Sequence, residues 1–327
     1  MLCKNQTGLS LVELMIAMSI GLLITSGIIS LMINSKRNYT ITEDNTIIQE
    51  NMRFAFEFIS RDMRQSGYGG CMSRREHNLR NLADSDGDGV DNIDEIYLNR
   101  TGIVGEDNTG VNNSDTLTLQ FGEDCNGKVT SKMGAESSDI ILTDENACNV
   151  EKDKLFLIAD CESSDLAYAT DVNVGAGVIS IKHATALNIS DKLSKAYGTS
   201  ARILTIHSNR YYIANNVDGN PSLFRDVWTT DGVITEELIE NVENLQVLYG
   251  EDFDNDNVPN TYVSFDDITD IENIVSLKTS LLIRGADNMR LSKHKYNYVI
   301  NKIGTEFTAN DKRTRRPITF TVSLRNK

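Results

Sequence analysis

Proline and histidine are scarce in this sequence, which has three prolines and four histidines among 327 residues. So few prolines exclude a collagen-like or proline-rich architecture. The histidines are scattered, and no two cysteines form a CxxC pair, which leaves a zinc site with little support. The GxSxG and HExxH motifs and paired His–acid arrangements are also missing. The sequence therefore predicts a protein that is not an enzyme.

Positive charge is in deficit as well. The formal net charge is -15, so the clustered Lys and Arg that neutralise phosphates are not expected. We therefore expect no nucleic-acid partner. A hydrophobic content of 40% argues against global disorder. An acidic surface of this kind suits an extracytoplasmic protein or one that binds cations.

One long apolar run lies near the N-terminus, from Leu9 to Ile33, and its only charged residue is Glu13. As a helix, these 25 residues would be roughly 38 Å long, enough to cross a bilayer core. A secretory signal peptide would have a shorter apolar region followed by a small-x-small cleavage site. A plain membrane anchor leaves Glu13 unexplained, because an unpaired carboxylate in a membrane helix costs about 2.5–3.5 kcal/mol.

Cleavage between Gly8 and Leu9 would explain Glu13. The new α-amino group at Leu9 would be a cation at the start of the apolar helix, and Glu13 lies about one turn further along. When such helices bundle, the Glu13 carboxylate could pair with the amine of a neighbouring subunit. An acid inside a membrane segment indicates a function, and here we name that amine as its partner.

The stretch GLSLVELMIA, which starts at Gly8, resembles the class III signal of type IV pilins and type II secretion pseudopilins. The resemblance implies cleavage after Gly8 by prepilin peptidase, methylation of the new N-terminus at Leu9, and a structural role for Glu13 as the fifth mature residue. Leu9 departs from the commoner Phe. Residues 1–8 would be a leader peptide, and its removal discards Cys3.

The helix is expected to continue beyond the membrane, because apolar residues recur at spacings of three and four. Gly67, Gly69 and Gly70 would then end it. We expect one long helix over 9–66, with the transmembrane part at about 9–33 and a possible break in the polar stretch 34–45. The apolar stripe comprises Ile48, Met52, Ala55, Phe56, Ile59 and Met63.

The remainder, 67–327, is expected to form an extracytoplasmic head. It contains short runs rich in Val, Ile, Leu, Thr and Tyr that are separated by Gly, Asn, Asp and Ser, which favours a mostly antiparallel β-sheet assembly with long loops. The predicted class is therefore α+β. The expected strands are Thr116–Phe121, Lys154–Ala159, Val178–Ile181, Ala201–Ile206, Leu245–Tyr249, Ile274–Ile283 and Ile318–Leu324.

Four further stretches resemble PilW-type minor pilins. They are RDMRQSGYGGC at Arg61–Cys71, LFLIADCESSDLAYAT around Cys161, VLYGEDFDNDNVPNTY at Val247–Tyr262 and RTRRPITFTVSLRNK at the C-terminus. The resemblance implies a pilin-like fold, in which half of a long helix lies in the membrane and half packs under the head.

Four cysteines remain once Cys3 is discarded, an even number that suits two disulfides in an oxidising compartment. Cys148 and Cys161 flank an expected strand and are the favoured pair, which leaves Cys71 to pair with Cys125. Four cysteines allow three connectivities, and all three remain open.

The stretch DSDGDGVDNIDE fits the twelve-residue calcium-loop template. Acidic side chains occupy its first, third and fifth positions, a glycine allows the sharp turn at the sixth, and a glutamate closes it. The alternative is a solvated acidic turn. The predicted Ca²⁺ ligands are Asp84, Asp86, Asp88, the Val90 carbonyl, Asn92 and Glu95, with Asp91 and Asp94 in reserve.

A second acidic loop begins in the same way, with Asp252, Asp254 and Asp256 followed by the Val258 carbonyl. It lacks the turn glycine, although Asn257 tolerates a left-handed conformation. Its twelfth position is Val263, so Asp266 or Asp267 would have to supply the last carboxylate. This is the weaker of the two predicted calcium sites.

The resemblance implies a structural minor pilin that primes or caps type IV pilus assembly within a tip complex. Its expected partners are other minor pilins, the major pilin, prepilin peptidase and the inner-membrane assembly platform. The chain would cross the inner membrane once, with a periplasmic head, and then move to the pilus tip. The alternatives are a J-type minor pseudopilin of type II secretion and a calcium-dependent tip adhesion module.

Overall fold

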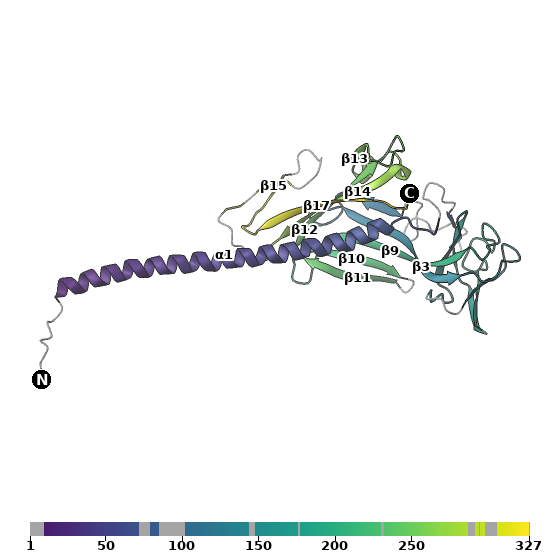
Figure 1. Cartoon of the computed structure of the whole chain (residues 1–327), viewed down its shortest axis with the longest axis horizontal. Coiled ribbons are helices and arrows are strands. Elements are labelled where there is room, and N and C mark those ends of the chain that lie inside the picture. The colour runs from purple at the N-terminus through teal and green to yellow at the C-terminus, as the bar shows by residue number, and fades with distance from the viewer. Residues whose placement is uncertain are drawn as a thin grey trace.

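The computed structural model of the chain describes residues 10–71, 79–84, 102–143, 148–175, 177–229, 232–286, 292–293, 295–297 and 306–326. The fold consists of one long helix and a β-rich head, as Figure 1 shows. The N-terminal half of the helix projects alone, and the C-terminal half lies along the head.

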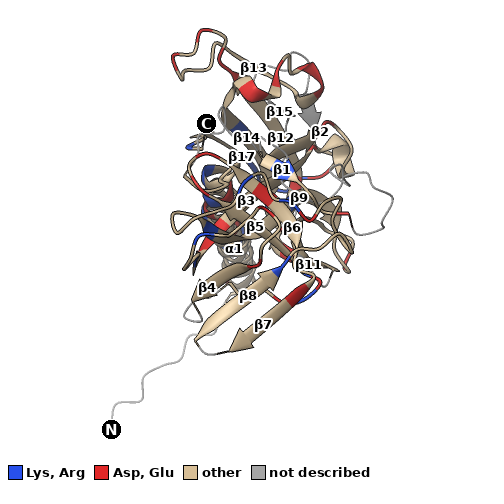
Figure 2. Ribbon diagram, turned by 90° about the vertical axis from the view of Figure 1, so that its right-hand side faces the viewer, with Lys and Arg blue, Asp and Glu red and all other residues tan. Residues whose placement is uncertain are grey.

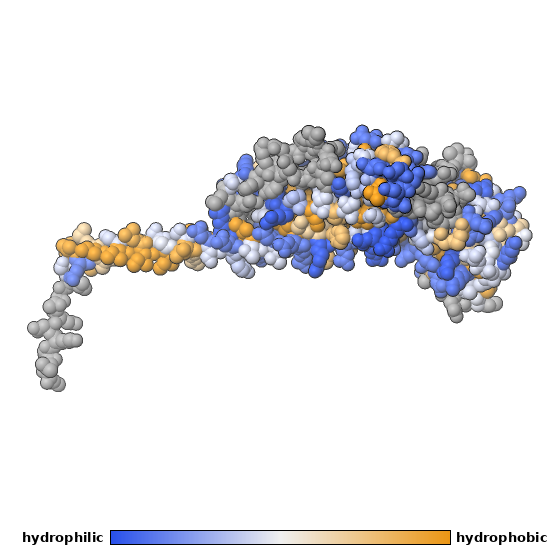
Figure 3. All heavy atoms as spheres, turned by 45° about the horizontal axis from the view of Figure 1, so that its top comes forward, coloured by the Kyte–Doolittle hydropathy of each residue, from blue (hydrophilic) through white to orange (hydrophobic). Residues whose placement is uncertain are grey.

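Helix α1 runs from Leu11 to Gln65, 55 residues, and is roughly 82 Å long. It is the one helix of the described chain that is long and apolar enough to cross a membrane, and the residues of its apolar window are not buried within the chain. In Figure 3, hydrophobic residues cover this projecting half. Removing such a surface from water is the main driving force for its insertion into a bilayer.

The polar stretch 34–45 does not interrupt α1, so the possible break is not present. Thr40, Thr42 and Thr46 donate side-chain hydrogen bonds to the carbonyls four residues earlier, at 3.2, 2.8 and 3.0 Å. Their hydroxyl groups are thereby satisfied along the helix surface, which lets polar residues continue the helix without a cap.

The predicted apolar stripe faces the head. Ile48, Ala55, Ile59 and Met63 are fully buried. Phe56 lies at the border of the stripe, where its ring meets the Phe320 ring edge-on at a centroid distance of 5.1 Å. The helix is therefore held along its second half by an amphipathic face, as its periodicity predicts.

The larger sheet has eight strands, in the order β1-β6-β5-β9-β10-β11, with β3 pairing β9 and β2 pairing β3. Only the β1–β6 pair is parallel. Its strands are β1 (Leu79–Asn81), β2 (Ile103–Glu106), β3 (Thr116–Lys128), β5 (Leu155–Ala159), β6 (Ser164–Tyr168), β9 (Arg202–Asn215), β10 (Pro221–Thr229) and β11 (Gly232–Glu240).

A second sheet has the order β13-β12-β14-β17, and all its pairs are antiparallel. Its strands are β12 (Val242–Glu251), β13 (Thr261–Val263), β14 (Ile274–Arg284) and β17 (Arg315–Ser323). The smaller sheets are β4 (Ile140–Thr143), β8 (Val178–Lys182) and β7 (Asp171–Gly175), and the pair β15 (Lys295–Asn297) and β16 (Glu306–Thr308). Short 3-10 helices lie at Val111–Asn113, Phe265–Asp267 and Ile271–Asn273.

The main core lies between α1, the larger sheet and the second sheet, and it includes Leu117, Tyr211, Leu245 and Leu281. Another core lies under the three-stranded sheet at the end of the head far from the N-terminus, around Phe156 and Tyr197. Packing of a helix and sheets around shared apolar faces is the expected way to bury them. The α+β class and the mostly antiparallel head are confirmed.

The helix exit is tightly packed against the larger sheet. The backbone N–H of Gly67 donates to the Gln120 carbonyl at 2.9 Å, and the Ser66 hydroxyl donates to the Gly102 carbonyl at 2.9 Å. Gly102 has a φ of 61°, and a Cβ there would collide with the Gly67 nitrogen. The backbone can approach this closely because Gly102 lacks a side chain.

Candidate functional site

The residues of the predicted processing signal fall partly outside the described chain: Gly8 and Leu9 are not described, whereas Glu13 is. Glu13 lies in the first turn of α1 with its side chain exposed. The Ser10 N–H donates to Glu13 Oε2 at 3.2 Å, and the Glu13 N–H donates to Ser10 Oγ at 3.4 Å. These two bonds form a capping box, which satisfies donors at the helix start.

The capping role of Glu13 was not foreseen, although the S-x-x-E spacing that signals it is plain in the sequence. It gives Glu13 a stabilising function within one chain, because a carboxylate at a helix N-terminus also complements the helix dipole. Pairing of Glu13 with the amine of a neighbouring subunit remains a prediction.

At its other end, α1 is anchored by the buried carboxylate of Asp62, which is 5% exposed. Tyr211 Oη and Asn209 Nδ2, both on β9, donate to Asp62 Oδ2 at 2.6 and 2.7 Å. Burial and the neighbouring Asp62 charge raise the pKa of Tyr211, so the phenol keeps its proton and remains a donor. Asp62 thus fixes the end of the helix to the sheet.

The disulfides join Cys71 to Cys161 and Cys125 to Cys148. The two bonds themselves are as expected, but the favoured pairing of Cys148 with Cys161 is wrong. These two cysteines flank β5, and a five-residue strand is roughly 17 Å long. That length exceeds the Cα–Cα reach of a disulfide, about 7 Å, so flanking a strand separates the two cysteines.

Each observed pair instead joins neighbouring elements. Cys161 lies in the turn after β5, beside the helix exit that carries Cys71. Cys148 packs against β3, which carries Cys125, and its sulfur lies 3.8 Å from the Ile203 carbonyl on β9. The first bond therefore ties α1 to the larger sheet, and the second closes the distal core.

Most of the first predicted calcium loop lies outside the described residues, including Asp86, Asp88, Val90, Asn92 and Glu95. Only Asp84 is described. It is buried, and its backbone N–H donates to the Leu187 carbonyl at 3.0 Å. The first loop therefore remains a prediction.

In the second acidic loop, carboxylate oxygens of Asp252, Asp254 and Asp256 lie within 4.8 Å of one another. Ca²⁺ binds oxygens at about 2.3–2.6 Å, so ligands on opposite sides of one ion are separated by up to roughly this distance. Asn255 and Asn257 adopt φ values of 61° and 66°, so asparagine does take the left-handed positions. Figure 2 shows further acidic positions around the neighbouring β13.

Asp252 is the buried anchor of this loop, while Asp254 and Asp256 are exposed. Burial alone would raise the pKa of Asp252, but the backbone N–H groups of Asn257 and Asn255 donate to its carboxylate at 2.9 and 2.8 Å and lower the pKa overall. The donor set, three carboxylates in one tight loop, fits a hard cation. Of the two candidates for the last carboxylate, Asp267 accepts a hydrogen bond from the Ser264 hydroxyl, and Asp266 is exposed.

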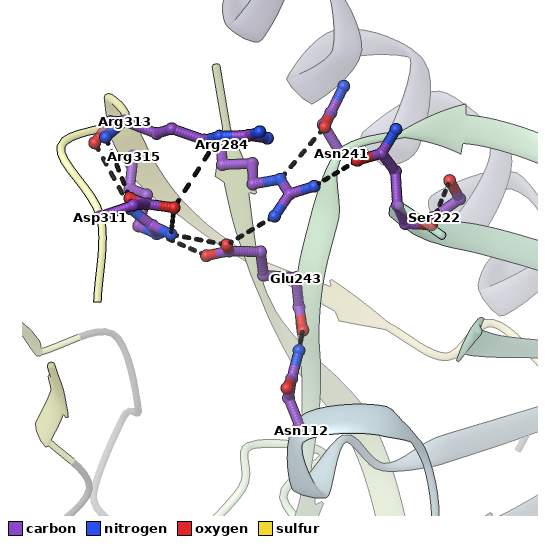
Figure 4. A network of polar contacts seen from close by, with 9 residues as sticks. Asn112, Ser222, Asn241, Glu243, Arg284, Asp311, Arg313 and Arg315 are labelled. Atoms are coloured by element: carbon purple, nitrogen blue, oxygen red, sulfur yellow. Dashed lines mark hydrogen bonds and ion pairs between the residues drawn. The ribbon is translucent and has the colours of Figure 1, made fainter. Parts of the chain in front are cut away.

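A buried network of charged side chains links strands β12, β14 and β17 of the second sheet, as Figure 4 shows. Arg315 Nε and Nη2 donate to the two carboxylate oxygens of Glu243 at 2.6 and 2.7 Å, and Arg315 Nη1 donates to Asp311 at 2.6 Å. The side chains of Arg315 and Glu243 are 3% and 5% exposed. Arg284, opposite Arg315 in the β14–β17 register, donates to Asn241 and Asn220 at 3.1 and 2.8 Å.

In this network, the carboxylates of Glu243 and Asp311 neutralise the neighbouring guanidinium groups of Arg284 and Arg315. Burial would lower the pKa of Arg315, but its bonds to Asp311 and Glu243 raise the pKa overall. The same bond to Arg315 lowers the pKa of Asp311 to about 2. The sequence gives no local signal for this network, because its members come from three strands and a loop that meet only in the fold.

Two family models match the chain. Residues 3–29 match the prokaryotic N-terminal methylation motif. This match, the apolar helix and the β-rich head together fit a pilin-like protein with a membrane anchor. Residues 210–326 match the model of type IV pilus-assembly protein W, a segment that contains Glu243, Arg284 and Arg315. The matches support a type IV pilin-like minor pilin of the PilW type, and a pilin has a structural role.

Comparisons with curated proteins and with solved structures gave no significant match.

Proposed function

We propose that this minor pilin primes or caps type IV pilus assembly, as one member of a complex with other minor pilins at the pilus tip. The observation that carries the proposal is the bulk of the head at one end of a membrane-length helix. The head lies along and beyond the second half of α1, and its described residues bury two large cores. In a repetitive shaft, identical subunits must stack closely, so such a head suits a low-copy position.

Assembly would proceed from the membrane. Prepilin peptidase would cleave after Gly8, the head would lie in the periplasm, and the inner-membrane platform would move the chain into the pilus with the major pilin behind it. Glu13 would then neutralise the new amine of a neighbouring subunit. Placing that carboxylate in an apolar environment without a partner is costly, so the pairing would favour incorporation.

We expect Glu13→Ala to leave cleavage intact but to reduce recovery of the chain in pili by about tenfold or more, which corresponds to about 1.4 kcal/mol or more. Glu50→Ala changes an exposed acid on the same helix outside the membrane segment and serves as the control. The measurement is mass spectrometry of the intact chain and its partners, extracted from membranes and from sheared pili.

Recovery of other minor pilins with the chain would support the proposal. Recovery of secretion pseudopilins, with lost exoprotein secretion and normal twitching motility in a deletion strain, would instead identify the J-type pseudopilin. Normal incorporation of the Glu13→Ala chain would contradict the pairing.

We also propose that the acidic loops bind Ca²⁺ and stabilise the head. The compact Asp252, Asp254 and Asp256 cluster supports this for the second loop. A ligand that binds only the folded state at 100 times its Kd adds about 2.7 kcal/mol to the free energy of unfolding. Bound calcium would thus reduce the repulsion between the carboxylates of this loop and stabilise its conformation.

We expect millimolar Ca²⁺ to raise the melting temperature of the wild-type chain by several degrees, roughly 5 °C. Asp254→Asn/Asp256→Asn should lower the calcium stoichiometry in titration calorimetry by one, because both residues are exposed and their loss spares the fold. Asp218→Asn, at an exposed acid in the turn between β9 and β10, is the control. An unchanged stoichiometry in the double variant would rule out the second loop.

A further inference from the structure

Three arginines gather where α1 ends. Arg61 and Arg64 lie in its last turns, and Arg325 precedes Asn326, whose side-chain amide donates to the carbonyls of Arg64, Gln65 and Ser66 at 3.3, 3.1 and 3.3 Å. All three arginines are exposed, and none forms an ion pair with another residue of the described chain. Figure 2 shows basic positions beside the C-terminus. Because the chain has a net charge of -15, a cluster of cations without acidic partners is not expected from its composition.

Capping of the helix does not account for these arginines. Cations near a helix C-terminus interact favourably with its exposed carbonyls. Here the Asn326 amide already serves the carbonyls of Arg64, Gln65 and Ser66. The guanidinium groups are therefore available to an external anionic group, and arginine suits that role because its planar fork matches carboxylates.

A cavity of about 250 Å³ opens beside Arg61. Phe58, Arg61, Asp62 and Gln65 of α1 line one side, and Phe121, Glu123, His207, Asn209 and Arg225 of the larger sheet line the other. The two acids have partners inside the chain, since Asp62 accepts from Tyr211 and Asn209 and Glu123 lies 2.8 Å from His207 Nε2. The Phe121 and His207 rings stack at a centroid distance of 5.3 Å, and Phe58 is 37% exposed. The volume is below the roughly 300–1,000 Å³ typical of small-molecule sites, so the cavity suits a single side chain of a protein partner.

The distance of this surface from the membrane excludes lipid headgroups as the anionic group that it binds. Arg61 lies roughly 40 Å along α1 beyond Ile33, where the apolar segment ends. Charges at the membrane surface are screened within a Debye length of about 8 Å at physiological ionic strength. The anionic group must therefore come from a soluble part of a partner.

We propose that the end of α1 is a docking surface for an acidic segment of another pilus subunit. Carboxylates of the partner pair with Arg61, Arg64 and Arg325, and one aromatic or aliphatic side chain of the same segment enters the cavity beside Phe58. The inference rests on the proposed function for the identity of the partner as a pilus subunit. The rigid attachment of the surface, through Asp62 to Tyr211 and Asn209, preorganises it for binding.

The first test uses purified full-length chain in detergent and a fluorescent peptide of alternating Glu and Tyr as the probe. We expect Arg61→Glu/Arg64→Glu to weaken peptide binding by about tenfold or more, and binding by the wild type to fall with added salt. Lys132→Glu/Lys152→Glu alters the net charge equally at exposed residues and should bind normally. Equal binding by both double variants would overturn the proposal.

The second test places a photo-crosslinking amino acid at Gln65 of the full-length chain in cells. We expect an adduct with a different pilus subunit, identified by mass spectrometry, that is lost with Arg61→Gln/Arg64→Gln. The glutamine variant removes the positive charges without adding negative ones at the helix end. Its melting temperature shows whether it folds as the wild type does. An adduct that persists in this variant, or one formed only between two copies of this chain, would contradict the docking surface.

The two proposals fail in different ways. If the chain is recovered with minor pilins but Gln65 yields no adduct, the docking surface is wrong and the assembly function stands. If the chain is not recovered with pilus subunits, the proposed function itself is wrong.

Discussion

Replacement of Arg315 by methionine is expected to lower the free energy of unfolding of the head by about 3–5 kcal/mol. The substitution keeps an unbranched side chain of similar length but leaves the Glu243 carboxylate, 5% exposed, without its bidentate partner and with the longer 3.5 Å contact to Arg284. A buried charge without a partner is far more costly than a matched pair is stabilising. The expected fall in melting temperature is roughly 10 °C.

Arg316→Met is the matched control, because Arg316 is the next residue on β17 and is exposed. It should change the melting temperature by only a degree or two, about the effect of an ordinary surface substitution. The double variant Glu243→Gln/Arg315→Met removes both charges and should recover part of the loss. Thermal and urea unfolding that did not distinguish Arg315→Met from Arg316→Met would show that the network is unimportant for stability.

Removal of the Cys71–Cys161 disulfide, with alanine at both positions, is the second change of large expected effect. The bond closes a sequence separation of 90 residues and ties the helix exit to the turn after β5. Loss of such a cross-link should reduce the free energy of unfolding by about 2–5 kcal/mol, chiefly because the unfolded chain gains conformational freedom. Urea unfolding under oxidising conditions measures the loss.

Reducing conditions supply the control for that experiment. When both disulfides are reduced, the wild type and the Cys71→Ala/Cys161→Ala variant should have nearly the same stability, because neither then holds this cross-link. Peptide mapping without reduction checks the connectivity directly. A Cys148–Cys161 peptide in that map would support the pairing favoured from the sequence and contradict the structure.

Some features could be predicted because they depend on residues that are close in sequence. The processing signal, the apolar length and the stripe from Ile48 to Met63 are local patterns, and α1 follows them. Helix periodicity and membrane thickness act over a few turns, so neighbouring residues suffice to specify them. The capping box at Ser10 and Glu13 belongs to the same group, although its S-x-x-E spacing went unused.

Strands were predicted where Val, Ile, Leu, Thr and Tyr are concentrated in a short run, as in β12, β14 and β17. Strands β10 and β11 were missed, since β10 contains Pro221, Arg225 and Asp226, and β11 is largely exposed. Their polar side chains are accommodated by partners across the sheet, such as Arg225 with Glu236 at 2.6 Å. Cross-strand pairing of this kind is invisible in either segment alone.

By itself, the sequence determined which segment is long and apolar enough to cross a membrane, which face of its helix packs and that its head is built of strands, because each depends on local periodicity and composition. Only the tertiary structure decided which cysteines pair and how Glu243, Arg284, Asp311 and Arg315 balance one another. Those outcomes depend on which strands become neighbours. Strand order is a property of the whole head, because a single pairing is stable only when the surrounding core has formed.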